Sequence, residues 1–254
     1  MRKLIINSVL IVLAFIIAHF GRDVLHSYVA IPFLTHFFRV SYFYFWWFFP
    51  TLLVLGILYG FKDLLKNLGL NKGLLIGFLF ALITVLPMLI SSAIIGKIDE
   101  NHDFGILFQN TFCAGFFEEY LFRGFLFGIL FRKLKWGFIP ASILGALIFG
   151  LGHIYQGSTP METLGVFAVT SIGAIWFAWL YIEWNANLWV PIFLHTFMNL
   201  SWLLFEMSEN ALGGLYTNLF RAVTIALTII ITIRYHKERG LKISRENLII
   251  NNNS

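Results

Sequence analysis

Three charged side chains lie close together in a stretch that is otherwise almost wholly apolar. Glu118, Glu119 and Arg123 fall within the run 104–131. A charged residue at the centre of a membrane-spanning helix costs roughly 2.5–3.5 kcal/mol on insertion scales, so three unpaired charges would cost several kcal/mol. Buried charges of this kind usually pair with one another or face a wet cavity, where they perform chemistry. This cluster is therefore the first candidate for a functional site.

The spacing within the cluster predicts different roles for the two carboxylates. Glu119 and Arg123 are four residues apart with the acid first, which is the favourable order for an ion pair on a helix. Glu118 lies about 100° around the helix from Glu119 and points elsewhere. We therefore expect Glu119 and Arg123 to support the local structure and Glu118 to be a general base. The alternative is an inert charged triad between helices, although two carboxylates exceed what one arginine needs.

Two histidines provide the second chemical signal. His153 and His195 lie within apolar runs, and each has a partner on its own helical face four residues away, Phe149 and Asn199 respectively. Together with the acidic cluster they offer a general base, an imidazole that shares a proton with water, and donors for a developing oxyanion. They equally resemble an incomplete zinc shell, in which two imidazoles and a carboxylate leave one position open. The residues alone leave both interpretations open.

Composition places these residues in a membrane. Of the 254 residues, 59% are hydrophobic and only 12% are charged, whereas soluble proteins have about 25% charged residues. The net charge of +5 does not indicate a nucleic-acid partner, because the basic residues fall in short loops beside apolar runs. Cys113 is the only cysteine, which excludes a disulfide framework and a cysteine-based metal site.

Apolar runs of roughly 18–25 residues are long enough to cross a bilayer as helices. Eight such runs predict an all-α, polytopic transmembrane bundle of about eight helices. We expect a single membrane domain over residues 1–254, with the first run retained as a span. The predicted spans are Leu4–Phe20, Tyr42–Phe61, Gly73–Ile95, Phe104–Phe131, Trp136–Tyr155, Leu164–Ile182, Leu188–Phe205 and Tyr216–Tyr235.

Lysine and arginine predict the orientation of the bundle. Thirteen of these residues fall in the segments that share a side with the N-terminus, and four fall on the opposite side. Because cytoplasmic loops carry the excess of Lys and Arg, both termini are predicted to be cytoplasmic. Only the linker around Glu183 breaks the pattern, since it should be cytoplasmic and has no basic residue.

These residues, in this order, resemble the CPBP family of intramembrane proteases, the CAAX-protease and bacteriocin-processing (Abi) group. The family pattern E-E-x-x-x-R, F-x-x-x-H, H-x-x-x-N is filled over about Gly115–Asn199, and Asn187–Pro191 resembles the approach to its last motif. The motif residues are Glu118, Glu119, Arg123, Phe149, His153, His195 and Asn199.

The resemblance implies a helical bundle around an intramembrane polar cavity, with residues 104–206 as the catalytic core. It implies an endopeptidase that uses activated water, with Glu118 as general base and His153 orienting the water. His195 and Asn199 would stabilise the oxyanion, and Glu119 and Arg123 would be supporting. No cofactor is certain; if zinc is used, Glu118, His153 and His195 would hold it.

The expected partners are a peptide or lipidated-peptide substrate and the lipid bilayer, with no nucleic acid. We expect the chain in the plasma membrane of a prokaryote. Two competing functions use the same residues differently. A proton-coupled transporter would use buried Glu and His, but no repeat relates the two halves of the sequence. A non-catalytic scaffold or immunity protein would keep the motif for stability alone.

The charge bias makes a testable topology prediction. In Cys113→Ala protein, single cysteines at Asn71 and Asp99 should be labelled from opposite sides of the membrane by an impermeant thiol reagent. Asn71 should react from the cytoplasmic side, because its linker is rich in lysine. Labelling of both positions from one side would contradict the eight-span topology.

Overall fold

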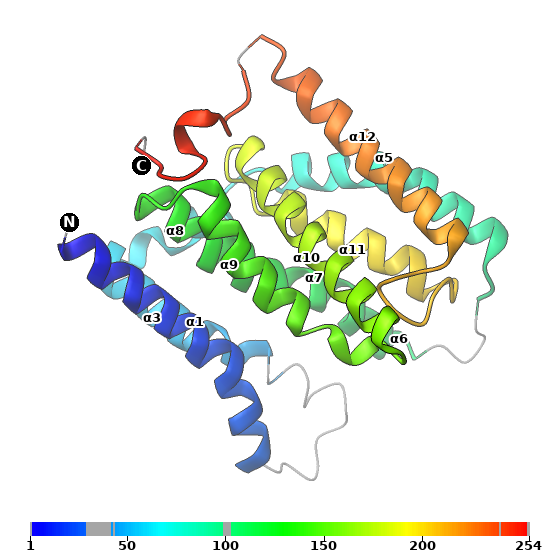
Figure 1. The fold of residues 1–254 in the computed structure, drawn as a ribbon, viewed down its shortest axis with the longest axis horizontal. Helices are drawn as coiled ribbons and strands as arrows, with labels where there is room; N and C mark the ends of the chain where they lie inside the picture. Colours follow the sequence, from blue (N-terminus) through cyan, green and yellow to red (C-terminus); the bar gives the residue numbers. More distant parts are fainter. Residues whose placement is uncertain (1, 29–41, 43, 99–102, 239, 253–254) are drawn as a thin grey trace.

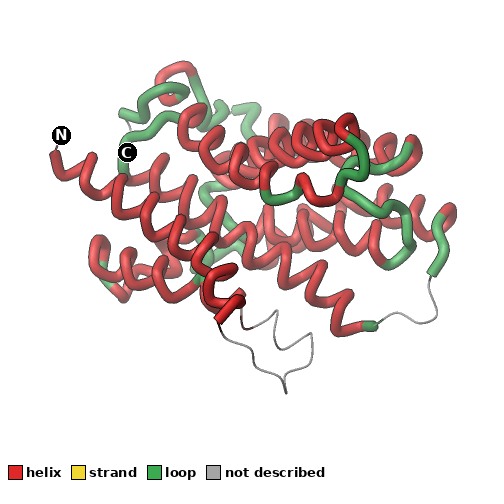
Figure 2. The backbone as a smooth tube through the Cα atoms, turned by 60° about the horizontal axis from the view of Figure 1, so that its bottom comes forward, coloured by secondary structure: helices red, strands yellow, loops and turns green. Residues whose placement is uncertain are grey.

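The computed structural model describes residues 2–28, 42, 44–98, 103–238 and 240–252 as a bundle of helices (Figures 1 and 2). Within these ranges the structure contains no strand, and extended pairing is limited to one isolated bridge between Trp136 and Ile250. The all-α prediction is therefore confirmed. Residues 99–102, and Arg39 and Arg239 of the charge count, lie outside the described residues.

The helices follow one another in the order predicted from the apolar runs. The α-helices are α1 (Arg2–Tyr28), α3 (Phe48–Tyr59), α4 (Leu64–Leu68), α5 (Leu74–Ile95), α6 (Phe104–Phe108), α7 (Ala114–Glu118), α8 (Gly128–Lys133), α9 (Phe138–Leu151), α10 (Pro160–Glu183), α11 (Trp189–Leu203) and α12 (Leu215–Tyr235). Short 3₁₀ turns are η1 (Phe61–Asp63), η4 (Ile154–Gln156) and η5 (Arg245–Asn247), and two segments are π-helical, η2 (Gln109–Cys113) and η3 (Glu119–Phe127).

Several helices are long and apolar enough to cross a bilayer, so the chain is an integral membrane protein. Their outward faces carry large apolar side chains, as on α5, where Ile83 is 58% and Ile94 is 78% exposed. A soluble protein rarely exposes such continuous apolar surface. Five described helical segments meet the criterion, namely Arg2–Gly21, Leu74–Ile95, Phe138–Gln156, Pro160–Glu183 and Leu215–Tyr235.

The count rises to six if the pair Tyr44–Tyr59 and Phe61–Leu68, bent by 118°, forms one broken span. The two remaining predicted spans are helical but do not meet the same criterion. The segment from α6 to α8 carries Glu118, Glu119 and Arg123, and α11 has only 15 residues. The count of eight therefore stays a prediction, and the two helices in question are those that carry most of the motif residues.

The helix from Phe104 to Lys133 is continuous but not uniform. Two stretches within it, η2 and η3, have the wider π-helical turn. In η2, for example, the N–H of Ala114 donates to the carbonyl oxygen of Gln109, five residues back. π-Helical turns are rare and often occur at functional sites. The second one begins at Glu119, so the change in helical pitch falls directly on the charged cluster.

This irregular helix lies at the centre of the fold. Its η3 segment contacts α1, α9, α10 and α11, and its η2 and α7 segments pack along α11. All nine residues of η3 are buried. Helix α11 also packs along α5, and α9 along α10 (Figure 1). The charged cluster is thereby enclosed by the helices that carry the two motif histidines.

The C-terminal segment folds back over the end of the bundle and contacts Glu183. The buried Glu183 carboxylate accepts hydrogen bonds from the backbone N–H groups of Lys242 and Ile243, at 2.9 and 3.0 Å. Its Oε2 also lies 3.5 Å from Nε2 of His236. Glu183 therefore connects the end of α10 to the C-terminal segment.

Replacing Glu183 should destabilise the protein. Glu183→Ala leaves two partly buried backbone N–H groups without their acceptor, and an unpaired donor costs at most about 1–3 kcal/mol when it is fully buried. We expect a clear drop in the midpoint of thermal unfolding in detergent and faster proteolysis of the tail. Glu238→Ala, at an exposed position of the same region, is the matched control. Equal stability of the two variants would contradict the role given to Glu183.

Candidate active site

The buried centre of the site is the predicted ion pair. Nη1 of Arg123 lies 3.2 Å from Oε1 of Glu119, and the side chains are 3% and 0% exposed. The spacing of four residues thus forms the pair that the sequence predicts, even though the pair falls in the π-helical segment η3. Removing one partner of a buried pair leaves an uncompensated charge, which is strongly destabilising. The pair therefore fixes the local structure.

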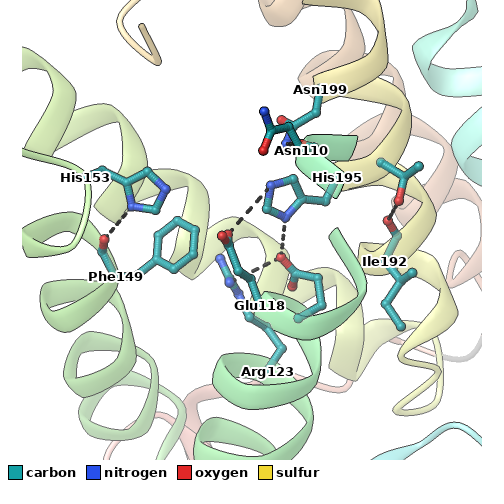
Figure 3. A network of polar contacts seen from close by, with 10 residues as sticks. Asn110, Glu118, Arg123, Phe149, His153, Ile192, His195 and Asn199 are labelled. Atoms are coloured by element: carbon teal, nitrogen blue, oxygen red, sulfur yellow. Dashed lines mark hydrogen bonds and ion pairs between the residues drawn. The ribbon is translucent and has the colours of Figure 1, made fainter. Parts of the chain in front are cut away.

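The same carboxylate also holds a histidine, a contact that the sequence did not predict. Nδ1 of His195 lies 2.9 Å from Oε1 of Glu119 (Figure 3). An ionised carboxylate only accepts hydrogen bonds, so Nδ1 carries the hydrogen and donates it. Glu119 thereby joins α11 to the central helix and fixes the orientation of the His195 ring. No local sequence signal indicates this contact, because the two residues are 76 positions apart.

Glu118 faces the other nitrogen of the same ring. Its Oε2 lies 3.9 Å from Nε2 of His195, and the two side chains are 18% and 14% exposed. This distance is too long for a direct hydrogen bond, and a bridging water suits such separations. Oε2 of Glu118 is buried and has no hydrogen-bond partner among the described residues. Glu118 therefore lies outside the ion pair that Glu119 forms with Arg123, as its place on the helix predicted.

His153 lies at the end of α9, where the helix passes into η4. Its Nδ1 is 2.7 Å from the backbone oxygen of Phe149, and its ring packs 4.4 Å from the Phe149 ring. The carbonyl can only accept, so Nδ1 is the donor and Nε2 of the neutral ring is left as an acceptor. In Figure 3 the ring extends from α9 toward the side on which Glu118 and His195 lie.

Asn199 is one turn beyond His195 on α11 and binds the central helix. Its Nδ2 donates to the backbone oxygen of Asn110, in the π-helical segment η2, at 3.0 Å. This partner was missed by sequence reasoning, because a backbone carbonyl leaves no residue-type signal. An amide nitrogen has two hydrogens, and the second remains for another acceptor.

The geometry does not assemble the three-ligand metal set considered from the sequence. Among the described residues, no group of three or more His, Cys, Asp or Glu side chains is close enough to hold a metal ion. Glu118 and His195 are neighbours, and His153 does not complete a metal-binding group with them among the described residues. In this arrangement of side chains the three residues do not form a zinc site.

Gly115 allows the central helix and α11 to approach closely enough for these contacts. It lies three residues before Glu118, on the face toward α11. A Cβ atom at this position would lie 2.6 Å from Oγ1 of Thr196 and 3.1 Å from the backbone oxygen of Ile192. The hydroxyl of Thr196 is itself tied to that oxygen, at 2.8 Å (Figure 3). A side chain at position 115 would therefore force the two helices apart.

Substitution of Gly115 should show this constraint. Gly115→Ala is expected to destabilise the protein by about 1–3 kcal/mol, the usual cost of overpacking a close interface. The control is Gly173→Ala in α10, where a Cβ would meet no atom within 4 Å, and where alanine should be neutral or favourable in a helix. Thermal unfolding of both variants in detergent measures the difference, and equal midpoints would contradict the close approach at Gly115.

Comparison with known proteins finds one family match, over the segment that carries the site residues. No curated protein and no solved structure matches the chain. Residues 100–201 match a family described as Rce1-like, type II CAAX prenyl endopeptidase Rce1-like. This segment includes every motif residue from Glu118 to Asn199 and covers less than half of the chain. The resemblance drawn from the three motifs is thereby confirmed, and over residues 100–201 the chain matches the CAAX-protease family of intramembrane endopeptidases.

Proposed function

We propose that the protein is an intramembrane endopeptidase that hydrolyses a peptide bond in a membrane-associated or lipidated peptide. The proposal rests on the different environments of two adjacent carboxylates, Glu118 and Glu119. Glu119 is fully buried, and its Oε1 lies 3.2 Å from Arg123 and 2.9 Å from His195, whereas Glu118 is 18% exposed and lies 3.9 Å from His195. A carboxylate that is partly open to water and is not held in a close ion pair among the described residues can act as a general base.

In the proposed reaction, Glu118 takes a proton from a water molecule as the water oxygen attacks the peptide carbonyl carbon. The C=O π bond opens, and its electrons form the oxyanion of a tetrahedral intermediate. Collapse of this intermediate breaks the C–N bond, and Glu118 passes its proton to the leaving nitrogen. The acceptor Nε2 of His153 would orient the water. All steps use side chains of this site.

His195 and Asn199 are the proposed oxyanion donors of the site. As an oxyanion donor, His195 would act with a hydrogen on both ring nitrogens. The protonated ring donates from both nitrogens. Nδ1 would stay on Glu119, and Nε2–H would face the reaction beside Glu118. The second amide hydrogen of Asn199, one turn away, would be the other donor, with its orientation held by the Asn110 carbonyl.

The substrate follows from the surroundings of the site. Side chains enclosed by membrane helices admit an extended peptide more readily than a folded protein, and a lipid anchor would bring such a peptide to the bilayer. We propose residues 104–206 as the catalytic core of a single membrane domain, facing a polar cavity. Location in a prokaryotic plasma membrane with cytoplasmic termini belongs to the same proposal.

Matched glutamine variants test the proposed function. Purified protein in liposomes should cleave a farnesylated C-terminal peptide, and cleave the unlipidated peptide more slowly. Glu118→Gln should abolish cleavage with little loss of thermal stability, because the amide is nearly isosteric but is not a base. Glu119→Gln should lose both activity and stability, because it leaves Arg123 without its buried counter-ion.

The outcomes separate the competing functions. A scaffold or immunity protein would keep its phenotype in Glu118→Gln, and a proton-coupled transporter would show Glu118-dependent proton flux without cleavage. Equal thermal shifts for the two glutamine variants would contradict the division of labour. Failure of the wild type to cleave any peptide of a broad lipidated and unlipidated library would contradict the endopeptidase function.

The oxyanion role predicts a specific kinetic pattern. His195→Ala and Asn199→Ala should each lower turnover by about 10²–10³, the usual cost of losing one oxyanion donor, with little change in substrate affinity. Elemental analysis of the wild type and of His195→Ala should show no difference in zinc content. Stoichiometric zinc in the wild type and none in the variant would contradict the donor role and support a metalloprotease.

A further inference from the structure

The guanidinium of Arg123 is surrounded by aromatic rings. Its Cζ lies 4.5 Å from the centre of the Phe149 ring, 5.5 Å from that of Phe177 and 5.9 Å from that of Phe122. Arg123 is buried, and Nη1 has no well-aligned hydrogen bond among the described residues, although it lies near Glu119. Cation–π attraction strengthens when the cation is removed from water. The rings therefore replace part of the hydration that this cation has lost.

Phe177 has a second contact that links the cation to the reacting groups. Its ring centre lies 5.8 Å from that of His195, with the two planes at 58°. Phe177 is on α10, a helix to which no family motif was assigned, and is 7% exposed. One buried ring thus contacts both partners of the Glu119 carboxylate, Arg123 on one side and His195 on the other.

We propose that Phe177 is a positioning residue for the hydrolytic reaction. Its ring holds the Arg123 guanidinium and limits rotation of the His195 ring. Glu119 can then contact both partners at once, and Nε2 of His195 stays directed toward Glu118. The proposal rests on the proposed endopeptidase function, and it gives α10 a role in the chemistry beyond packing.

Phe80 is a control for a general packing role of Phe177. It belongs to the same buried apolar cluster as Phe177 and is 5% exposed. Its ring packs 4.6 Å from that of Trp184. Phe80→Leu and Phe177→Leu therefore each remove one phenyl ring from the same cluster. Only Phe177→Leu removes a ring that contacts Arg123 and His195. The pair forms a matched comparison.

The experiment compares Phe177→Leu, Phe177→Tyr and Phe80→Leu in the peptide-cleavage assay. We expect Phe177→Leu to lower kcat about tenfold with KM nearly unchanged, because substrate contacts remain. Phe177→Tyr keeps the aromatic face and should recover most of kcat. Phe80→Leu should leave kcat near that of the wild type. Equal kcat values for the two leucine variants, or no recovery with tyrosine, would overturn the proposal.

A spectroscopic measurement separates this inference from the proposed function. The Nδ1 proton of His195, bonded to Glu119, can be followed by NMR and assigned with His195→Ala. We expect it to broaden in Phe177→Leu and to remain sharp in Phe177→Tyr and Phe80→Leu. An unchanged signal in Phe177→Leu would contradict the positioning role, whereas a wild type without hydrolytic activity would contradict the proposed function alone.

Discussion

A single buried carboxylate with two partners organises this protein. Glu119 is 0% exposed and lies 3.2 Å from Arg123 on its own helix and 2.9 Å from His195 on α11. A fully buried carboxylate is tolerated at this position because a guanidinium lies beside it. The same charge then fixes the orientation of an imidazole on another helix. Glu118 lies outside this arrangement, partly exposed and 3.9 Å from the second nitrogen of the ring. This difference in exposure and partners between two adjacent residues is the basis of the proposed chemistry.

The rest of the fold maintains this contact. Gly115 permits the close approach of the central helix to α11, and the π-helical turn η2 offers the Asn110 carbonyl to Asn199. The second π-helical turn begins at Glu119 itself. Aromatic rings from α9 and α10 cover the guanidinium. π-Helical turns are rare and often occur at functional sites, and here one of them contains the buried Glu119–Arg123 ion pair.

Local patterns in the sequence predict the local features well. Spacing of four residues gives the Glu119–Arg123 pair, and apolar runs give the helices in their correct order. The contact between Glu119 and His195 depends on how two distant helices pack, which no periodicity encodes. The π-helical turns were also missed, because they arise from packing rather than from residue type. The apolar runs predicted spans at the charged central helix and at the short α11, but neither is among the described helices that are long and apolar enough to cross a bilayer. The hydrogen bonds from the C-terminal segment to the Glu183 carboxylate likewise depend on packing between distant segments.

The claim that Glu118 activates water directly is tested by hydrolysis in ¹⁸O-labelled water under single-turnover conditions. If Glu118 is a general base, one labelled oxygen enters the new C-terminal carboxylate of the product. Mass spectrometry of the protein should then find no label in the peptide that contains Glu118. Label in Glu118 after one turnover, with none in the product, would show that the carboxylate itself attacks the substrate. That result would contradict the mechanism proposed for this site.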